Sequence, residues 1–350
     1  MTVRVGFLGA GFIATFHSKM LKGAADAGLD VEWAGVHDPD AAKVASFSAA
    51  SGAPVCTTED ELLDRSDAVF VCTWTAEHPR LVDAVVERGL PVFCEKPLAT
   101  DLEGARAMTR AVTAAGVTNQ VGLVLRRSPA FLFAKQLIED ERSGRPMSVV
   151  FRDDQYLPVQ GQYGSDWRAD PARAGSGALL EHSIHDVDIL EWLLGPVATV
   201  NGHTAELHGL EGIEDNVAVS FAFAGGALGV LTSVWHDLLE RPSLRRIEVF
   251  CERLHVVIEG DWFGPVHWTR AGDESGSIEG GELFAAAIGP DDPDEGNPDA
   301  AFVRAVADGL PASPSFADAL RAHVVTDAIY RSAAGDGAAV AVPPGLPELG

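Results

Sequence analysis

The sequence, of 350 residues, contains little cysteine and little positive charge. Its 4 cysteines lie far apart and form no C-x-x-C pair: Cys56, Cys72, Cys94 and Cys251. This spacing favours neither a disulfide framework nor a zinc site, and we interpret the four as small buried hydrophobic residues. Lysine and arginine number 26 against 51 acidic residues, so the net charge is −25 with histidine neutral. Such a charge repels phosphate backbones and anionic lipids, which argues against nucleic acid and membrane as partners.

Long apolar runs and metal-binding patterns are also missing. No apolar stretch approaches the roughly 18–20 residues that a membrane helix needs. The segment MTVRVGFLGAGF has the pattern of a strand and a loop, not that of a signal peptide, so we expect a soluble cytoplasmic protein. No metal is expected, because none of the following histidines forms an H-E-x-x-H pair: His182, His185, His203, His208 and His236.

What the sequence does contain is ample apolar material for a large core, with 47% hydrophobic residues. The length favours two domains. In the first part, Ala-rich segments suited to helices alternate with short, nearly continuous apolar runs: 3–9, 31–38, 68–74, 91–96 and 120–125. Such runs are typical of strands covered by helices on both faces. We therefore predict an α/β Rossmann domain over residues 1–125, with a doubly wound parallel sheet.

The pattern changes after this domain. Alternating strands follow one another in hairpin succession, with a Gly225-Gly226 turn, and helices are predicted at 129–142, 178–194, 298–309 and 315–334. This succession indicates an α+β domain over 126–350 with a large, mostly antiparallel sheet, which would bind the substrate. The acidic, proline-containing segment 291–299 is predicted to be a solvated loop.

The strand that contains Val217 and Phe221 carries alanines on its opposite side, at Ala218 and Ala222. A sheet with helices on one face and an apolar second face favours a partner. We therefore expect a homodimer or homotetramer formed through this sheet. A chain that keeps a mildly apolar open face is the alternative.

A glycine-rich turn follows the first predicted strand and opens a helix. Its residues match the pattern G-x-G-x-x-G/A: Gly9, Ala10, Gly11, Phe12, Ile13 and Ala14. Gly9 permits a tight turn, Gly11 lets the backbone approach a diphosphate, and the diphosphate would bind at the helix N-terminus. A loop that merely turns the chain is the alternative, because the motif alone is weak.

Asp38 strengthens the nucleotide interpretation. It ends the second predicted strand, at the spacing expected for an acid that binds ribose hydroxyls. A 2′-phosphate would meet its carboxylate, so NAD is favoured over NADP. The alternative is that Asp38 is only a turn residue before Pro39.

Polar residues at strand and helix ends complete the candidate site. Lys96 lies at the carboxyl end of a predicted strand, where open α/β sheets bind ligands, and the bond to Pro97 is a candidate for a cis peptide. Glu181, His185 and Asp188 fall on one face of the helix predicted over 178–194. A histidine beside a carboxylate can exchange protons near neutral pH. The alternatives are an ordinary salt bridge for the lysine and a helix face hydrogen-bonded to a neighbouring domain.

Several of these segments occur together in one known family. Thr73 and His78, the segment Phe93-Cys94-Glu95-Lys96-Pro97-Leu98, the tripeptide 166–168 and the segment 175–188 follow in order. In this the chain resembles the Gfo/Idh/MocA oxidoreductases, which include inositol dehydrogenases and glucose–fructose oxidoreductase. The resemblance covers essentially the whole chain, and is densest over residues 1–195. It departs from the family at Trp74, usually proline, at Glu181, usually aspartate, and at Ser183, usually glycine.

The resemblance implies that His185 takes the hydroxyl proton, that Lys96 polarises the oxygen, and that Glu181 orients the pair. It implies that the cofactor contacts, besides the glycine turn and Asp38, these residues: Thr73, Trp74, His78, Glu95, Lys96, Trp167 and Arg168. Trp167 and Arg168 would meet the nicotinamide end or the substrate; an aromatic anchor beside a surface cation is the alternative.

The function we expect is NAD-dependent oxidation or reduction of a sugar, inositol or related polyol. A sugar phosphate would need basic residues such as Arg126, Arg127, Arg168 and Arg173, and with the acidic net charge we favour a neutral substrate. One alternative keeps the fold but oxidises the sugar only transiently, with no net redox change. Another is a regulator that binds dinucleotide or sugar without turnover, against which Lys96 and His185 argue.

Overall fold

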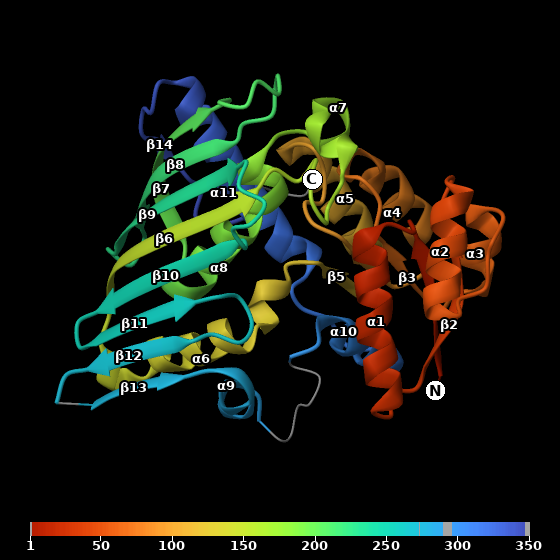
Figure 1. The fold of residues 1–350 in the computed structure, drawn as a ribbon, viewed down its shortest axis with the longest axis horizontal. Helices are drawn as coiled ribbons and strands as arrows, with labels where there is room; N and C mark the ends of the chain where they lie inside the picture. The colour runs from red at the N-terminus through yellow and green to blue at the C-terminus, as the bar shows by residue number, and fades with distance from the viewer. Residues whose placement is uncertain (1, 273, 290–295, 347–350) are drawn as a thin grey trace. The chain divides into compact units, whose positions relative to one another are not determined.

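The computed structural model describes residues 2–272, 274–289 and 296–346, and the chain forms two compact units (Figure 1). Among the described residues, the first unit contains the chain up to Leu123 together with Asn297–Leu320, and the second contains the chain from Val124 to Gly296 and from Arg321 to Leu346. This differs in one respect from the expected division into 1–125 and 126–350. The boundary lies close to the expected position, but the segment 297–320 returns to the first unit.

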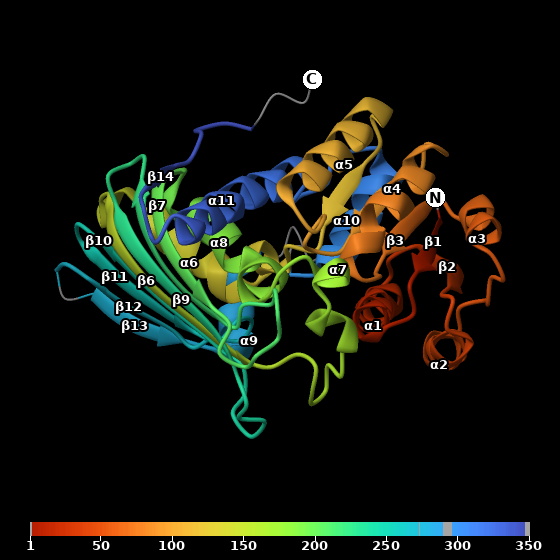
Figure 2. The same ribbon diagram turned by 90° about the horizontal axis from the view of Figure 1, so that it is seen from above.

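The first unit has a parallel sheet of five strands in the order β2-β1-β3-β4-β5, which confirms the predicted doubly wound sheet. Figure 2 shows helices α1 and α2 on one side of it and α4 and α5 on the other. The strands are β1 (Val3–Leu8), β2 (Val31–His37), β3 (Ala68–Val71), β4 (Val92–Cys94) and β5 (Asn119–Val121). The helices are α1 (Phe12–Asp26), α2 (Ala41–Ser51), α3 (Glu59–Arg65), α4 (His78–Val86) and α5 (Leu102–Ala115).

Aromatic packing explains why the late segment joins the first unit. Phe70 of β3 and Phe93 of β4 stack with their ring centroids 4.6 Å apart. Phe302, from α10 (Pro298–Asp308), lies edge-on to Phe70 with a centroid separation of 5.4 Å. All three rings are buried. Complete burial of an aromatic ring stabilises a fold by about 1.5–3 kcal/mol, so α10 is an integral layer of this unit.

The second unit is built on one sheet of nine strands, in the order β13-β12-β11-β10-β6-β9-β8-β7-β14. Its pairings are antiparallel except between β6 and β9, so the sheet is mostly antiparallel as predicted. The strands are β6 (Pro146–Tyr156), β7 (Val197–Ala205), β8 (Asn216–Phe223), β9 (Leu228–His236), β10 (Leu244–Cys251), β11 (Leu254–Glu259), β12 (Val266–Arg270), β13 (Glu274–Ile278) and β14 (Val340–Ala341).

Helices cover one face of this sheet (Figure 2). They are α6 (Pro129–Glu139), α8 (Ile184–Leu194) and α11 (Phe316–Ala334); the short helices α7 (Pro171–Ala174) and α9 (Gly280–Ala287) belong to the same unit. Along β8 the residues alternate, with Val217, Val219, Phe221 and Phe223 buried. Sequence periodicity therefore identified the covered face correctly.

The structure differs from the sequence predictions at three places. Strands β12, β13 and β14 and helix α9 were missed; β13 is short and polar and lies at the edge of the sheet, and β14 has only two residues. The helix predicted over 178–194 is instead a π-helical turn (Ala178–His182) followed, after Ser183, by α8. Asp299 lies in the first turn of α10, in agreement with the helix predicted over 298–309, but it is completely buried and not solvated as predicted for 291–299, of which 291–295 lie outside the described residues.

The four cysteines are free thiols in buried positions, as their spacing predicted. Within the described ranges, no helix has the length and apolarity that crossing a membrane would require.

Candidate active site

The glycine turn between β1 and α1 has the geometry that close backbone contact requires. Gly9 has φ +100°, and a Cβ at this position would lie 2.4 Å from the carbonyl oxygen of Cys72. Gly11 is the N-cap of α1 and has no side chain to occupy the first helical turn, while Ala14 is buried against the core. Phe12 is 54% exposed and Ile13 is half-buried. A helix start that has no side-chain cap suits an anion such as a diphosphate.

Asp38 lies directly after β2 and is joined to this turn. One carboxylate oxygen, Oδ2, accepts a hydrogen bond from the Ala10 amide at 2.9 Å, and Oδ1 accepts one from the Asp40 amide at 2.8 Å. Each oxygen of an ionised carboxylate has a second lone pair. Asp38 can therefore support the glycine turn and still accept a hydroxyl of a ribose, so these residues fit a dinucleotide.

Lys96 follows β4 at the carboxyl edge of the same sheet. It is half-buried, and its peptide bond to Pro97 is cis, as anticipated. His78, at the start of α4, has Nδ1 2.9 Å from the Pro97 carbonyl oxygen and Nε2 3.3 Å from that of Thr73. The structure thus brings Thr73, His78 and the Lys96-Pro97 segment together, and the half-buried Trp74 lies beside them in sequence.

Glu95 is largely withdrawn from solvent, which the family resemblance alone did not indicate. Its Oε1 lies 2.9 Å from Nε2 of His17, and the other ring nitrogen of His17 contacts Asp299. A direct role of Glu95 in holding the cofactor remains a prediction. His17 and Asp299 were not identified from the sequence; His17 is one of two polar residues, with Ser18, among the buried residues of α1.

Trp167, Arg168 and Glu181 come together in the second unit. Arg168 donates from Nε to Oε2 of Glu181 at 2.8 Å, and its guanidinium carbon lies 4.4 Å from the centroid of the Trp167 ring. Glu181 is buried in the π-helical turn. A buried carboxylate paired with a stacked arginine is held in one orientation.

His185 occupies the first turn of α8 and is buried. Asp188, one turn further on, accepts two hydrogen bonds from Arg126, at 2.8 Å and 2.6 Å. The expectation that Glu181, His185 and Asp188 share one face of a continuous α-helix is wrong, because Glu181 precedes the break at Ser183. The role of Glu181 in orienting His185 stays a prediction.

Sequence reasoning missed a buried acidic pair next to His185. Asp186 accepts a hydrogen bond from Nε of Arg245 at 2.7 Å, and Ser183 donates to Asp153 at 3.1 Å. Burial, followed by the charge of Asp153, raises the pKa of Asp186 to about 8. The pair therefore holds a proton near neutral pH. These residues lie on α8, β6 and β10, so nothing in the linear sequence joined them.

A second residue that the sequence reasoning missed, Glu214, holds the π-helical turn in place through hydrogen bonds. Its carboxylate accepts hydrogen bonds from the amides of Gly177 at 2.7 Å and Leu179 at 2.9 Å, and from the hydroxyl of Tyr330 at 2.7 Å. A Cβ at Gly177 would lie 1.9 Å from the carbonyl oxygen of Glu214. Glycine is therefore required where the two segments approach, and the carboxylate acts as a cap for the turn that carries Glu181.

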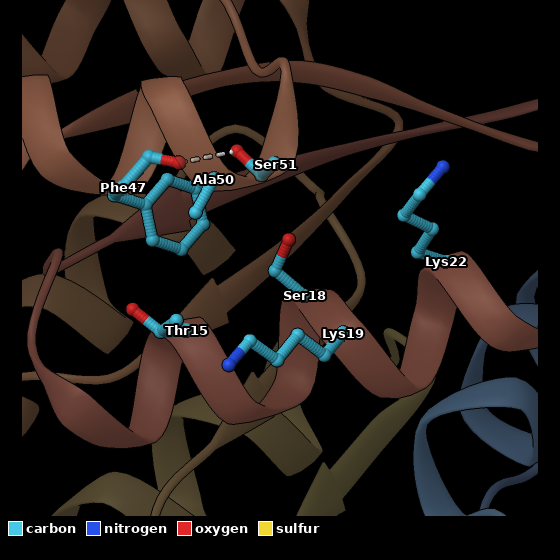
Figure 3. Close-up of a pocket in the computed structure, with 7 residues that line it drawn as sticks. All are labelled: Thr15, Ser18, Lys19, Lys22, Phe47, Ala50 and Ser51. Atoms are coloured by element: carbon cyan, nitrogen blue, oxygen red, sulfur yellow. Dashed lines mark hydrogen bonds between the residues drawn. The ribbon is translucent and has the colours of Figure 1, made fainter.

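Two further features of the described residues bear on ligands. No cluster of three or more metal-ligating side chains occurs within those ranges. A shallow hollow lies between α1 and α2 and contains none of the predicted site residues (Figure 3). It is lined by Thr15, Ser18, Lys19, Lys22, Phe47, Ala50 and Ser51.

Comparison with known proteins agrees with this geometry. Residues 3–123 match the model of the oxidoreductase family with an NAD-binding Rossmann fold, and residues 131–257 match that of the GFO/IDH/MocA C-terminal domain. Inositol 2-dehydrogenase of Rhizobium meliloti is 32% identical over 241 residues, covering 67% of this chain and 69% of that protein. Inositol 2-dehydrogenase of Cereibacter sphaeroides is 32% identical over 195 residues, covering 55% of this chain and 54% of that protein.

A solved structure shows the same architecture over nearly the full length. A levoglucosan dehydrogenase in complex with NADH and L-sorbose is 25% identical, with a TM-score of 0.84 over 98% of this chain and 99% of that chain. The chain belongs to the Gfo/Idh/MocA family of oxidoreductases, and its first unit is the family's NAD-binding Rossmann domain. In sequence, the matched region spans about half to two thirds of the two curated relatives.

Proposed function

We propose that the protein is an NAD-dependent oxidoreductase that transfers hydride between a carbinol carbon of a sugar, inositol or related polyol and the nicotinamide. The observation that carries this proposal is the carboxyl edge of the first sheet. There, the Gly9 turn, the Asp38 carboxylate that supports it and the Lys96 segment all follow parallel strands. Ligands of open α/β sheets bind at this edge. When bound, NAD supplies the hydride acceptor or donor.

Side chains of this protein must accept the hydroxyl proton and stabilise the negative charge that develops on the oxygen. Removing hydride from a carbinol carbon is feasible at neutral pH only if a base takes the hydroxyl proton. We assign this role to His185 and assign polarisation of the oxygen to the Lys96 ammonium, with Glu181 as orienting carboxylate. General acid–base assistance typically contributes about 10²–10⁴ in rate, and a fixed cation stabilises the developing alkoxide.

A neutral polyol fits the arginines of the second unit better than a phosphorylated or carboxylated sugar. Arg126 is paired with Asp188 at 2.6 Å, Arg168 with Glu181 at 2.8 Å, and Arg173 with Asp170 at 3.3 Å. In each pair the carboxylate already compensates the positive charge of the guanidinium, which weakens its attraction for a phosphate. Two similar proteins are named inositol 2-dehydrogenase, and a structural relative is described in complex with L-sorbose. Both compounds belong to this substrate class, which supports the proposal.

The uncovered face of the large sheet supports the further proposal of a homodimer or homotetramer. Val150 of β6 and Val230 of β9 are paired in register and are 45% and 43% exposed. Leu228 of β9, two residues before Val230, and Phe250 of the neighbouring strand β10 are also exposed. An exposed apolar patch of neighbouring side chains is a common site of protein association.

The decisive experiment screens neutral polyols, aldoses and aminocyclitols with NAD⁺ and NADP⁺, following absorbance at about 340 nm, the band of the reduced nicotinamide. Lys96→Met and His185→Ala, confirmed as folded by circular dichroism, should lose about 10²–10⁴ in kcat. Lys43→Met, at an exposed lysine of α2, is the matched control and should keep wild-type activity.

Two outcomes would contradict the proposal. Product formation without accumulating NADH would show transient oxidation of the sugar. Wild-type turnover by both folded site variants would show that the catalytic assignment is wrong.

A further inference from the structure

His17 lies at the centre of a buried charged network in the first unit. It projects from α1, the helix that follows the glycine turn, and only 1% of it is exposed. Its Nδ1 lies 2.7 Å from Oδ1 of Asp299, and its Nε2 lies 2.9 Å from Oε1 of Glu95. Phe70 and Phe93 pack against the ring, with centroids 5.7 Å and 5.0 Å away. One imidazole therefore connects α1, α10 and the end of β4.

The two contacts decide the charge of the ring. An ionised carboxylate can only accept hydrogen bonds, so an imidazole placed between two of them must carry hydrogen on both nitrogens. Burial by itself disfavours this cation, but the charges and hydrogen bonds of Asp299 and then Glu95 outweigh it and raise the pKa of His17 to about 10. Oδ2 of Asp299 has no hydrogen-bond partner in the described part of the chain, so Asp299 depends on His17 for compensation.

Glu95 transmits this arrangement to the lysine. While Oε1 contacts His17, Oε2 accepts a hydrogen bond from the backbone amide of Lys96 at 3.2 Å. A Cβ at Gly122 would lie 2.3 Å from Oε1 of Glu95, so the glycine leaves the space that the carboxylate fills. On the other side of the lysine, His78 contacts the Pro97 carbonyl. The backbone around Lys96 is thus fixed from two directions.

The network also determines the electrostatic environment of this segment. One imidazolium and two carboxylates leave a net charge of about −1, and a buried charge acts strongly on its neighbours. The other titratable groups that act on it are the Lys96 ammonium and His78, which help lower the pKa of Glu95 against the effect of burial, and the Cys72 and Cys94 thiols. Burial raises the pKa of both thiols, which keeps them neutral.

We propose that His17 is a positioning residue of the reaction: as a buried imidazolium between Asp299 and Glu95, it holds the Glu95 carboxylate against the Lys96 backbone and so sets where the lysine leaves the sheet. The same side chain joins the helix after the glycine turn to the lysine segment. The effect on catalysis rests on the proposed function, because it requires that Lys96 acts on the substrate. The charged state of His17 is independent of that function.

The first test compares His17→Gln with the double variant His17→Gln/Asp299→Asn. A single glutamine can donate to Glu95, but its oxygen then faces the Asp299 carboxylate. In the double variant that oxygen can accept from the asparagine amide, so all hydrogen bonds are restored. His203→Gln, at an exposed histidine of β7, is the control.

Measured on a polyol turned over by the wild type, at a temperature where all variants are folded, His17→Gln should lose about 30-fold in kcat. The dissociation constant of NADH should change by less than about threefold, and the double variant should regain most of the lost kcat. A purely structural role would lower the melting temperature and leave kcat unchanged. Wild-type kcat in folded His17→Gln, or equal kcat in the single and double variants, would overturn the proposal.

A second measurement needs no substrate. In protein labelled with ¹⁵N in histidine, the resonance that disappears in His17→Gln belongs to His17. Both ring nitrogens should remain protonated at about pH 8, well above the pH of about 6.5 at which an ordinary histidine titrates. A neutral tautomer at that pH would refute the charged network. Absence of any dehydrogenase turnover in the wild type would contradict the proposed function and leave this result standing.

Discussion

Arg168 and Glu181 are joined by a hydrogen bond of 2.8 Å, which ties the loop containing Trp167 to the π-helical turn that precedes α8. The guanidinium stacks on Trp167 and also donates to Oγ of Ser165 at 2.7 Å. Three separate interactions therefore define its position. Arg168, which the family resemblance assigned together with Trp167 to the nicotinamide end or the substrate, therefore also holds the Glu181 carboxylate in place.

Replacing this arginine tests that relationship. In Arg168→Lys the charge is kept, but an ammonium cannot reproduce the planar stacking or the directed donors. We expect kcat/KM for the polyol to fall about 10–100-fold with an unchanged circular dichroism spectrum. Arg173→Lys, at an exposed arginine paired with Asp170, is the control and should stay near wild type. An unaltered kcat/KM in Arg168→Lys would show that Glu181 needs no such support.

Asp38 should determine the choice between the two nicotinamide cofactors. In Asp38→Ser the acceptor for a ribose hydroxyl weakens and the negative charge that opposes a 2′-phosphate disappears. The ratio of kcat/KM for NADP⁺ to that for NAD⁺ should rise by about tenfold or more. Asp40→Ser is the matched control, because Asp40 caps α2 and serine is also a good cap. Steady-state kinetics with both cofactors measure the ratio, and an unchanged ratio would exclude Asp38 as the discriminating group.

The pH dependence of stability should reveal the protonation of His17. Its pKa is raised to about 10 in the folded chain. The stability this proton contributes is therefore complete below about pH 6.5 and is lost as the pH rises through about 10.

Between these limits the free energy of unfolding, measured by urea titration, should fall by up to about 1.4 kcal/mol per pH unit from this group. His17→Gln/Asp299→Asn should lack this component, because its amides do not titrate. Parallel curves for the wild type and the double variant would contradict the prediction.

Because of Asp186, the free energy of unfolding should decrease as the pH rises from about 4 to about 8. Burial and the charge of Asp153 raise its pKa to about 8, so the stability conferred by its proton is complete below the unfolded pKa of about 3.8 and is lost as pH rises through about 8. Asp186→Asn carries a permanent neutral amide whose oxygen can still accept from Arg245. At pH 8 it should therefore unfold with a free energy at least about 1 kcal/mol higher than wild type.

A matched variant gives the baseline for this measurement. Asp327→Asn changes a surface carboxylate in a helical pair with Arg331 and should shift the unfolding free energy by less than about 0.5 kcal/mol at any pH. If Asp186→Asn is less stable than wild type at pH 8, the pKa of Asp186 is not raised in the folded protein.

The oligomer can be tested on the open face of the large sheet. Charges at two exposed, paired positions, in Val150→Glu/Val230→Glu, should separate the subunits, because buried unpaired carboxylates are costly in an interface. We expect sedimentation velocity to change from a dimer or tetramer to a monomer with the fold intact. A monomeric wild-type protein would remove the proposal.

The sequence identified the elements whose signal is local. Apolar runs marked the parallel strands, alternation marked the covered side of β8, and the turn at Gly9 followed from the need for a positive φ and a close backbone approach. The edge strand β13 gave no such signal, because it is short and polar. The break between Glu181 and His185 was missed because the preceding turn is capped by Glu214, a residue just before β8 that lies 37 and 35 residues along the chain from the Gly177 and Leu179 amides it accepts from.

By itself, then, the amino-acid order determined the Rossmann domain, the mostly antiparallel second sheet and the residue types at the strand ends, because periodicity and turn chemistry act over a few neighbouring residues. Tertiary structure alone decided that Asp299, in an acidic segment typical of a solvated loop, is buried against His17. It also decided that Asp186 is buried together with the charged side chains of Asp153 and Arg245. Charge states of this kind depend on desolvation and on partners from distant segments, and no local pattern contains either.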